Sequence, residues 1–144
     1  MRQTRRVSLT SSHLSLLFVY GTLRRGEGRH DLLEELRAAW VGRGTVGGEL
    51  FDLGPFPGAV KSDPLSPRQI IGEVYRLADP PRALQALDEY ECLASGEPNL
   101  YRREITTVVL SGGERLEAWI YWLDQPPPVR RRIESGDYAD RRVR

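Results

Sequence analysis

One carboxylate in the sequence lies where helical periodicity predicts an apolar side chain. The segment from Pro80 to Glu91 has the pattern of an amphipathic helix, and Glu91 falls between Leu84 and Leu87 at about 100° per residue. Burial disfavours the charged carboxylate and raises its pKa, which suits a group that takes up and returns a proton near neutral pH. Glu91 is therefore a candidate general acid/base. In the alternative interpretation, the helix ends there and Glu91 emerges into solvent or caps another segment.

A second candidate site is the turn that ends the first predicted strand. Leu16 to Tyr20 is a compact apolar run, and Gly21 interrupts it. Glycine lets the main chain approach a ligand closely, and amides between a strand and a helix can converge on an anion. The turn Gly21-Thr22-Leu23 could therefore hold an anionic group without a charged side chain. An ordinary turn at a strand end has the same signature, so this interpretation depends on residues downstream.

Composition favours a single soluble domain with its own core. The 144 residues are 40% hydrophobic and 28% charged, with a formal net charge of +1. This charge predicts no strong attraction to nucleic acid or to a membrane surface, and no apolar run is long enough to cross a bilayer. Cys92 is the single cysteine, so no intrachain disulfide can form. We expect a cytoplasmic protein.

The two ends of the chain are predicted to be basic tails. Residues 1–13 contain arginines and several hydroxyl side chains, which are too polar for the core of a secretory signal. We expect a flexible basic tail over 1–13, one domain over 14–138 and a basic tail over 139–144.

Strand patterns outnumber helix patterns between these tails. After the first strand we expect, in order, a flexible basic loop from Arg24 to Arg29, a helix over 31–39, a glycine-broken extended region over 40–51, a turn over 52–58, a strand over 70–77 with a bulge at Gly72, a helix over 80–91 capped by Asp79, a hairpin of 101–110 and 117–123, and an end of the sheet at the prolines 126–128. Because the helices do not alternate strictly with the strands, the fold class is α+β, with a strongly curved sheet or barrel covered by helices.

Six short motifs support a resemblance when they are taken in order. They are Val19-Tyr20-Gly21-Thr22-Leu23, Gly48-Glu49-Leu50-Phe51-Asp52-Leu53-Gly54 with Pro57-Gly58, Gly72-Glu73-Val74-Tyr75, Leu87-Asp88-Glu89-Tyr90-Glu91, Tyr101-Arg102-Arg103 and Ser135-Gly136-Asp137-Tyr138. With this order and spacing, the chain resembles the gamma-glutamylcyclotransferase-like family, which includes gamma-glutamylamine cyclotransferases and avirulence-induced proteins.

The resemblance implies a fold, a reaction and a set of site residues. Members have a small mixed β-barrel with flanking helices, and the active ones release 5-oxoproline and a free amine from a gamma-glutamyl amide without a cofactor. The implied partner is thus a small gamma-glutamyl molecule. Glu91 matches the acid/base. The implied substrate-binding residues are Tyr20, Gly21, Thr22, Leu23 and Tyr138.

The chain departs from the family pattern at three positions. Cys92 follows the matched glutamate where glycine is common, and Phe51 and Phe56 stand where tyrosine is frequent. A side chain at position 92 could change the direction of Glu91, and the two phenylalanines remove hydroxyls from the neighbourhood of a ligand. The leaving amine, turnover itself and the oligomeric state are therefore open at this point.

Three other functions compete with a cyclotransferase. A nucleophilic or metal-bound Cys92 lacks suitable partners, because His13 and His30 are the only histidines and are far apart in sequence. A nucleic-acid surface is disfavoured, because the arginines are offset by 20 acidic residues and no nucleic-acid motif is present. The main alternative is a binding module that keeps the pocket and holds an acidic metabolite without turnover.

Overall fold

A computed structural model describes residues 14–63, 65–95 and 100–141 of the chain. The predicted tail over 1–13 and the last residues of the predicted tail over 139–144 lie outside this part. Of residues 92–95, only the backbone is described.

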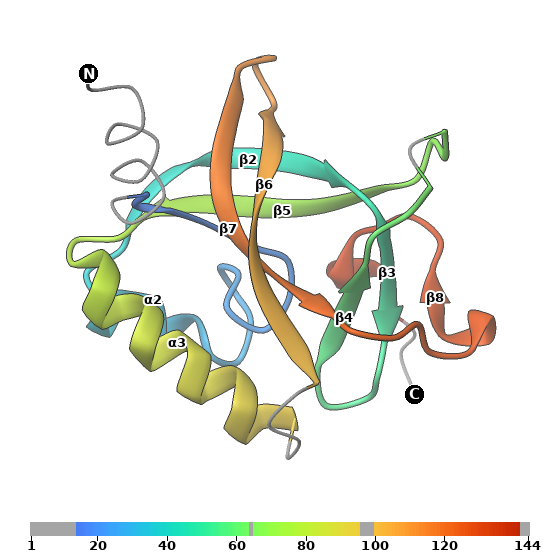
Figure 1. Ribbon diagram of the computed structural model, residues 1–144, viewed down its shortest axis with the longest axis horizontal. Coiled ribbons are helices and arrows are strands. Elements are labelled where there is room, and N and C mark those ends of the chain that lie inside the picture. The colour runs from blue at the N-terminus through green and yellow to red at the C-terminus, as the bar shows by residue number, and fades with distance from the viewer. Residues whose placement is uncertain (1–13, 64, 96–99, 142–144) are drawn as a thin grey trace, which may run out of the picture.

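The described residues form a closed barrel and a smaller sheet beside it (Figure 1). The barrel order is β1 (Leu16–Val19), β5 (Gln69–Arg76), β2 (Ala39–Gly47), β6 (Tyr101–Leu110) and β7 (Arg115–Leu123). Its strands pair antiparallel except for β1 and β7, which close it in parallel at Leu17 and Trp119. The second sheet has the order β4 (Pro57–Val60), β3 (Glu49–Asp52) and β8 (Arg132–Ile133). The predicted α+β fold with a mixed, curved barrel is confirmed.

Strand β1 is apolar throughout because both of its faces are buried. Leu16 and Phe18 belong to the cluster inside the barrel, whereas Leu17 and Val19 pack with the helices on the outside. This alternation follows from the two-residue period of a strand. The end of β1 is thus held from two sides, which fixes where the following turn begins.

The two α-helices of the described residues pack on the same side of the barrel (Figure 1). Helix α3 (Pro80–Ser95) begins as predicted, because the Asp79 carboxylate accepts the amide N–H of Arg82 at 3.4 Å. It continues one turn beyond the predicted end at Glu91. Within the described residues, no helix has both the length and the apolarity that a membrane crossing would need.

Helix α2 (His30–Glu35) is shorter than the predicted helix over 31–39. The chain reverses at Arg37, which has a φ of 56°. The amide of Arg37 donates to Glu34 O at 3.0 Å and that of Ala38 to Leu33 O at 2.9 Å. These two bonds form a Schellman motif, which usually ends on glycine. The sequence carries no glycine there, so the stop was missed.

Three further expectations about strands were wrong. The extended region over 40–51 is not broken at each glycine, because β2 is continuous from Ala39 to Gly47. The bulge lies between Trp40 and Gly42, whereas Gly72 pairs regularly with Gly44. Gly72 is instead required by close packing, since a Cβ there would overlap the carbonyl oxygen of Val19. The prolines at 126–128 do not end the sheet structure, because β8 follows them and pairs with β3.

Candidate active site

A small cavity lies where the turn after β1 faces helix α3. Its lining combines aromatic rings, main chain and one carboxyl group: Phe18, Val19, Tyr20, Gly21, Thr22, Leu23, Phe56, Pro57, Tyr90, Glu91, Tyr101 and Tyr121. The space open to the centre of a water molecule is about 30 Å³. An amide ligand must therefore extend toward solvent or displace side chains at the rim. The cavity joins Glu91 with four of the five residues that the family resemblance implied for substrate binding.

Glu91 lies inside helix α3 and not at its end. The residue is partly buried, and its carboxyl group faces the phenol-lined cavity. Loss of hydration, followed by the negative charge of Asp88, raises its pKa from 4.5 to about 8. The alternative in which Glu91 emerges into solvent at a helix end is therefore wrong. The group can hold or release a proton close to neutral pH.

The turn opposite Glu91 is held in one conformation by its own carbonyl groups. Gly21 O accepts the Arg24 amide at 3.0 Å, and Thr22 O accepts the Arg29 amide at 2.9 Å. Leu23 O lies 2.9 Å from His30 Nδ1, which must carry a proton because a carbonyl can only accept. The hydroxyls of Thr22 and Tyr90 lie 2.7 Å apart and join the turn to α3. These contacts fix the turn before any ligand arrives.

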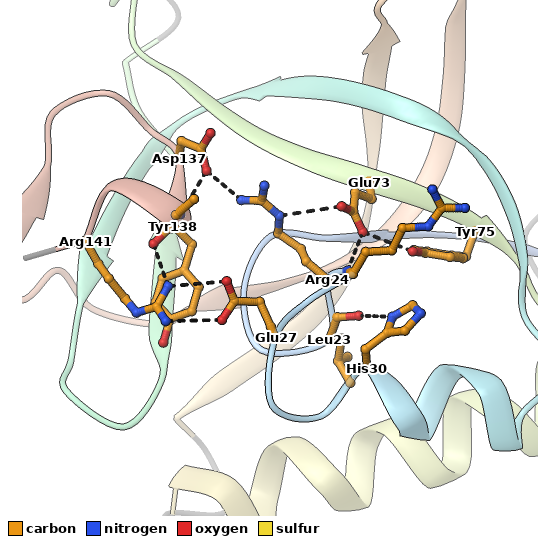
Figure 2. A network of polar contacts seen from close by, with 11 residues as sticks. Leu23, Arg24, Glu27, His30, Glu73, Tyr75, Asp137, Tyr138 and Arg141 are labelled. Atoms are coloured by element: carbon orange, nitrogen blue, oxygen red, sulfur yellow. Dashed lines mark hydrogen bonds and ion pairs between the residues drawn. The ribbon is translucent and has the colours of Figure 1, made fainter. Parts of the chain in front are cut away.

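A buried ion-pair network supports the chain just after this turn (Figure 2). Glu73 Oε1 accepts the Arg25 amide at 2.9 Å and the Tyr75 hydroxyl at 3.0 Å. The Arg24 guanidinium donates to Asp137 Oδ1 at 2.8 Å, and its Nε lies 3.8 Å from Glu73 Oε2. Buried charges are tolerated only when they are paired in this way.

This network corrects the prediction of a flexible basic loop from Arg24 to Arg29. Arg24 is only 7% exposed and Glu73 only 6% exposed, so the loop is anchored where it leaves the turn. A signal for this anchoring was present in the sequence, because Glu73 interrupts the apolar run from Ile70 to Tyr75. The pairing of Arg24 with Asp137 could not be predicted from the sequence, since the two residues are 113 positions apart.

Tyr138 is not among the residues that line the cavity. Its side chain is buried in the same hydrophobic cluster as Phe18 and Leu50, and the Arg141 guanidinium lies 4.1 Å from its ring centre. Arg141 also forms an ion pair with Glu27, on the loop after the turn, as Figure 2 shows. The structure therefore places Tyr138 beside the support of the turn.

Aromatic lining residues other than Tyr20 were missed or underrated from the sequence. The Tyr101 hydroxyl donates to Pro57 O at 2.5 Å and ties β6 to β4 at the cavity. The Tyr20 hydroxyl donates to Tyr121 O at 2.6 Å, beside the same space. Tyr121 alternates with core residues along β7, so its pattern does not distinguish a pocket position from a packed one.

Among the described side chains, no group of three or more His, Cys, Asp or Glu residues is placed to hold a metal ion. The side chain of Cys92 lies outside the described part of the chain.

Together, the fold and the cavity define a class: a small barrel protein with a carboxyl group of raised pKa in a cavity beside a main-chain turn that is held by hydrogen bonds. The model of the "Gamma-glutamyl cyclotransferase, AIG2-like" family matches residues 17–140. The chain is 32% identical to a candidate gamma-glutamylcyclotransferase of Methanocaldococcus jannaschii, over 90% of this chain and 99% of the relative. It is 33% identical to the gamma-glutamylaminecyclotransferase of Bos taurus, over 83% of this chain and 71% of the relative.

Solved structures show the same fold. An AIG2-like protein from mouse superposes with a TM-score of 0.65 at 25% identity, covering 79% of this chain and 80% of that one. The chain therefore belongs to the gamma-glutamyl cyclotransferase, AIG2-like family.

Proposed function

We propose that this protein is a cyclotransferase that releases 5-oxoproline and a free amine from a gamma-glutamyl amide, with Glu91 as the general acid/base. One observation carries the proposal. A carboxyl group with a pKa raised to about 8 shares a small cavity with a turn whose carbonyls are all engaged elsewhere. Family membership supports the same reaction class.

The reaction proceeds without an external nucleophile. Glu91, as a carboxylate, takes a proton from the alpha-ammonium group of the substrate, and the freed amine attacks the side-chain carbonyl carbon. A new C–N bond closes a five-membered ring. Glu91 then returns the proton to the departing nitrogen as the original amide bond breaks, and the ring nitrogen loses its second proton to the released amine or to water. Because the nucleophile and the carbonyl belong to one molecule, the protein mainly needs to orient them.

The main-chain turn supplies the binding element for negative charge. Amides of Gly21, Thr22 and Leu23 are suited either to the substrate carboxylate or to the oxyanion that forms on attack. Both roles require a rigid turn, which the hydrogen bonds of its carbonyls and the Arg24–Glu73 network favour. Tyr20 lines the cavity beside this turn. Tyr138 acts indirectly in this proposal, through the chain that supports the turn.

The test is turnover of a panel of gamma-glutamyl amides. The leaving groups should include an amino acid, a peptide, a polyamine and the side chain of lysine, with 5-oxoproline as the measured product. We expect Glu91→Gln to lower kcat by about 10²- to 10⁴-fold, the usual contribution of a general acid/base. The control is Glu89→Gln, which removes an exposed charge on the same helix and should leave turnover unchanged.

A different result would favour the binding module. If the pure protein releases no product, and binds 5-oxoproline or a gamma-glutamyl amide as tightly as the Glu91→Gln variant does, the cyclotransferase proposal is wrong.

A further inference from the structure

Glu91 has an acidic neighbour that the proposed reaction does not use. Asp88 precedes it by three residues on α3, and side chains with this spacing are neighbours on a helix surface. The charge of Asp88 is also the second cause, after lost hydration, of the raised pKa of Glu91. Any role of Asp88 in catalysis rests on the proposed function, because it concerns the proton of the same carboxyl group.

The Asp88 carboxylate is held by two strands of the barrel. Arg103 on β6 donates to both of its oxygens, from Nε to Oδ1 at 2.8 Å and from a terminal nitrogen to Oδ2 at 3.1 Å. The Tyr121 hydroxyl on β7 donates to Oδ1 at 2.5 Å. Arg103 is itself positioned by Trp119, whose ring centre lies 4.6 Å from the guanidinium carbon. A two-pronged guanidinium contact of this kind fixes both the position and the orientation of a carboxylate.

The two carboxyl groups therefore differ sharply in environment. Asp88 is exposed and paired with a cation, while Glu91 faces a cavity whose described lining includes no Arg, Lys or His side chain. Of the two, Glu91 is the carboxyl group that faces the cavity and is therefore the one placed to exchange a proton with a ligand there.

The other titratable groups facing Glu91 are phenols. Tyr20 after β1, Tyr90 on α3, Tyr101 on β6 and Tyr121 on β7 all line its cavity. Burial raises the pKa of each of them, so they are neutral across the range in which Glu91 titrates. Among the described residues, Asp88 supplies the charge that acts on the pKa of Glu91, and Arg103 is its ion-pair partner.

We propose that Asp88, clamped by Arg103 and Tyr121, is a positioning residue that sets the pH at which Glu91 exchanges its proton. Tyr121 connects Asp88 with Glu91, because its hydroxyl donates to Asp88 and its side chain lines the cavity of Glu91. Negative charge beside Glu91 strengthens its hold on the proton, and the arginine limits that effect.

A purely structural role makes a different prediction. The Asp88–Arg103 pair also ties α3 to β6, and loosening this contact would admit water to the cavity. Water would stabilise the Glu91 carboxylate whichever partner is removed, so both variants would lower the pH of half-titration. The electrostatic role requires opposite changes, because one variant removes a negative charge and the other removes a positive one.

The experiment follows the titration of the Glu91 carboxyl carbon by NMR, with Glu91→Gln to assign the signal. In Asp88→Asn we expect the half-titration pH to fall by about one pH unit, on the order of a screened interaction between neighbouring carboxylates. In Arg103→Met we expect it to rise. The matched control is Glu89→Gln, which removes one exposed charge from the same helix turn and should leave the value unchanged. Amide spectra establish that each variant is folded.

Turnover gives a second measurement of the same quantity. The acidic limb of the kcat/KM profile should move with the NMR value, which raises activity at pH 6, relative to its maximum, by up to about tenfold in Asp88→Asn. An unchanged Glu91 titration in both folded variants, or a shift of the same sign in both, would overturn the inference. The NMR titration needs no substrate, so a protein without turnover would refute the proposed function and still decide the role of Asp88.

Discussion

Replacing Glu91 with glutamine should stabilise the protein in alkaline solution, although it removes the proposed acid/base. The pKa of Glu91 is raised in the folded state, from 4.5 to about 8, so the folded protein keeps a proton that the unfolded chain has already lost. Between pH 4.5 and about pH 8, the free energy of unfolding of the wild type must therefore fall as the pH rises. Glutamine is neutral and similar in shape, and it cannot contribute to this loss.

The size of the stabilisation by Glu91→Gln follows from the same rise in the pKa of Glu91. One pH unit corresponds to about 1.4 kcal/mol, so a rise of the pKa from 4.5 to about 8 amounts to at most about 5 kcal/mol. Because Glu91 is only partly buried, we expect Glu91→Gln to be more stable than wild type by about 3 to 5 kcal/mol at pH 9. Below pH 4.5 the carboxyl is protonated in both states, and the two proteins should have similar stability.

The assay is urea unfolding of both proteins at a series of pH values from 4 to 9. The difference in free energy of unfolding isolates Glu91, because all other titrating groups are common to both proteins. This difference should grow as the pH rises from 4.5 to about 8 and then level off. The exposed Glu89→Gln serves as the control and should show no such growth. A pH-independent difference, or a glutamine variant that is less stable at pH 9, would refute the desolvated carboxyl in the cavity.

Three further substitutions test the support of the site. In Gly21→Ala the new Cβ would overlap the ring of Pro57, so the turn and β4 must separate. The affinity for 5-oxoproline or a gamma-glutamyl amide, measured by calorimetry, should fall at least about tenfold. An unchanged affinity would contradict the close approach of Gly21 to Pro57. Arg24→Met removes the buried cation that pairs with buried Glu73 and half-buried Asp137, and should cost about 3 to 5 kcal/mol in urea unfolding; a cost below about 1 kcal/mol would show that the network is dispensable. Arg37→Gly removes a left-handed side-chain penalty and should raise stability by about 1 kcal/mol, and a loss of stability would argue against the Schellman motif.

The sequence by itself determined the features that depend on neighbouring residues. Helical periodicity alone selected Glu91 as the carboxyl on an apolar face, and the aspartate before two prolines marked the start of α3. The hairpin of β6 and β7 followed from its β-branched residues and its glycine turn. These signals are readable because caps, turns and side-chain periods act over a few residues.

Only the tertiary structure decided which distant groups meet. It buried Arg24 against Asp137, brought Arg103 and Tyr121 to Asp88, and added β8 to the second sheet. None of these pairings has a local sequence signature, because each depends on how the barrel closes and on which surfaces are buried from water. The sequence could therefore point to Glu91 as the candidate proton carrier, while the surroundings of its carboxyl group, and with them its raised pKa, are a property of the folded barrel.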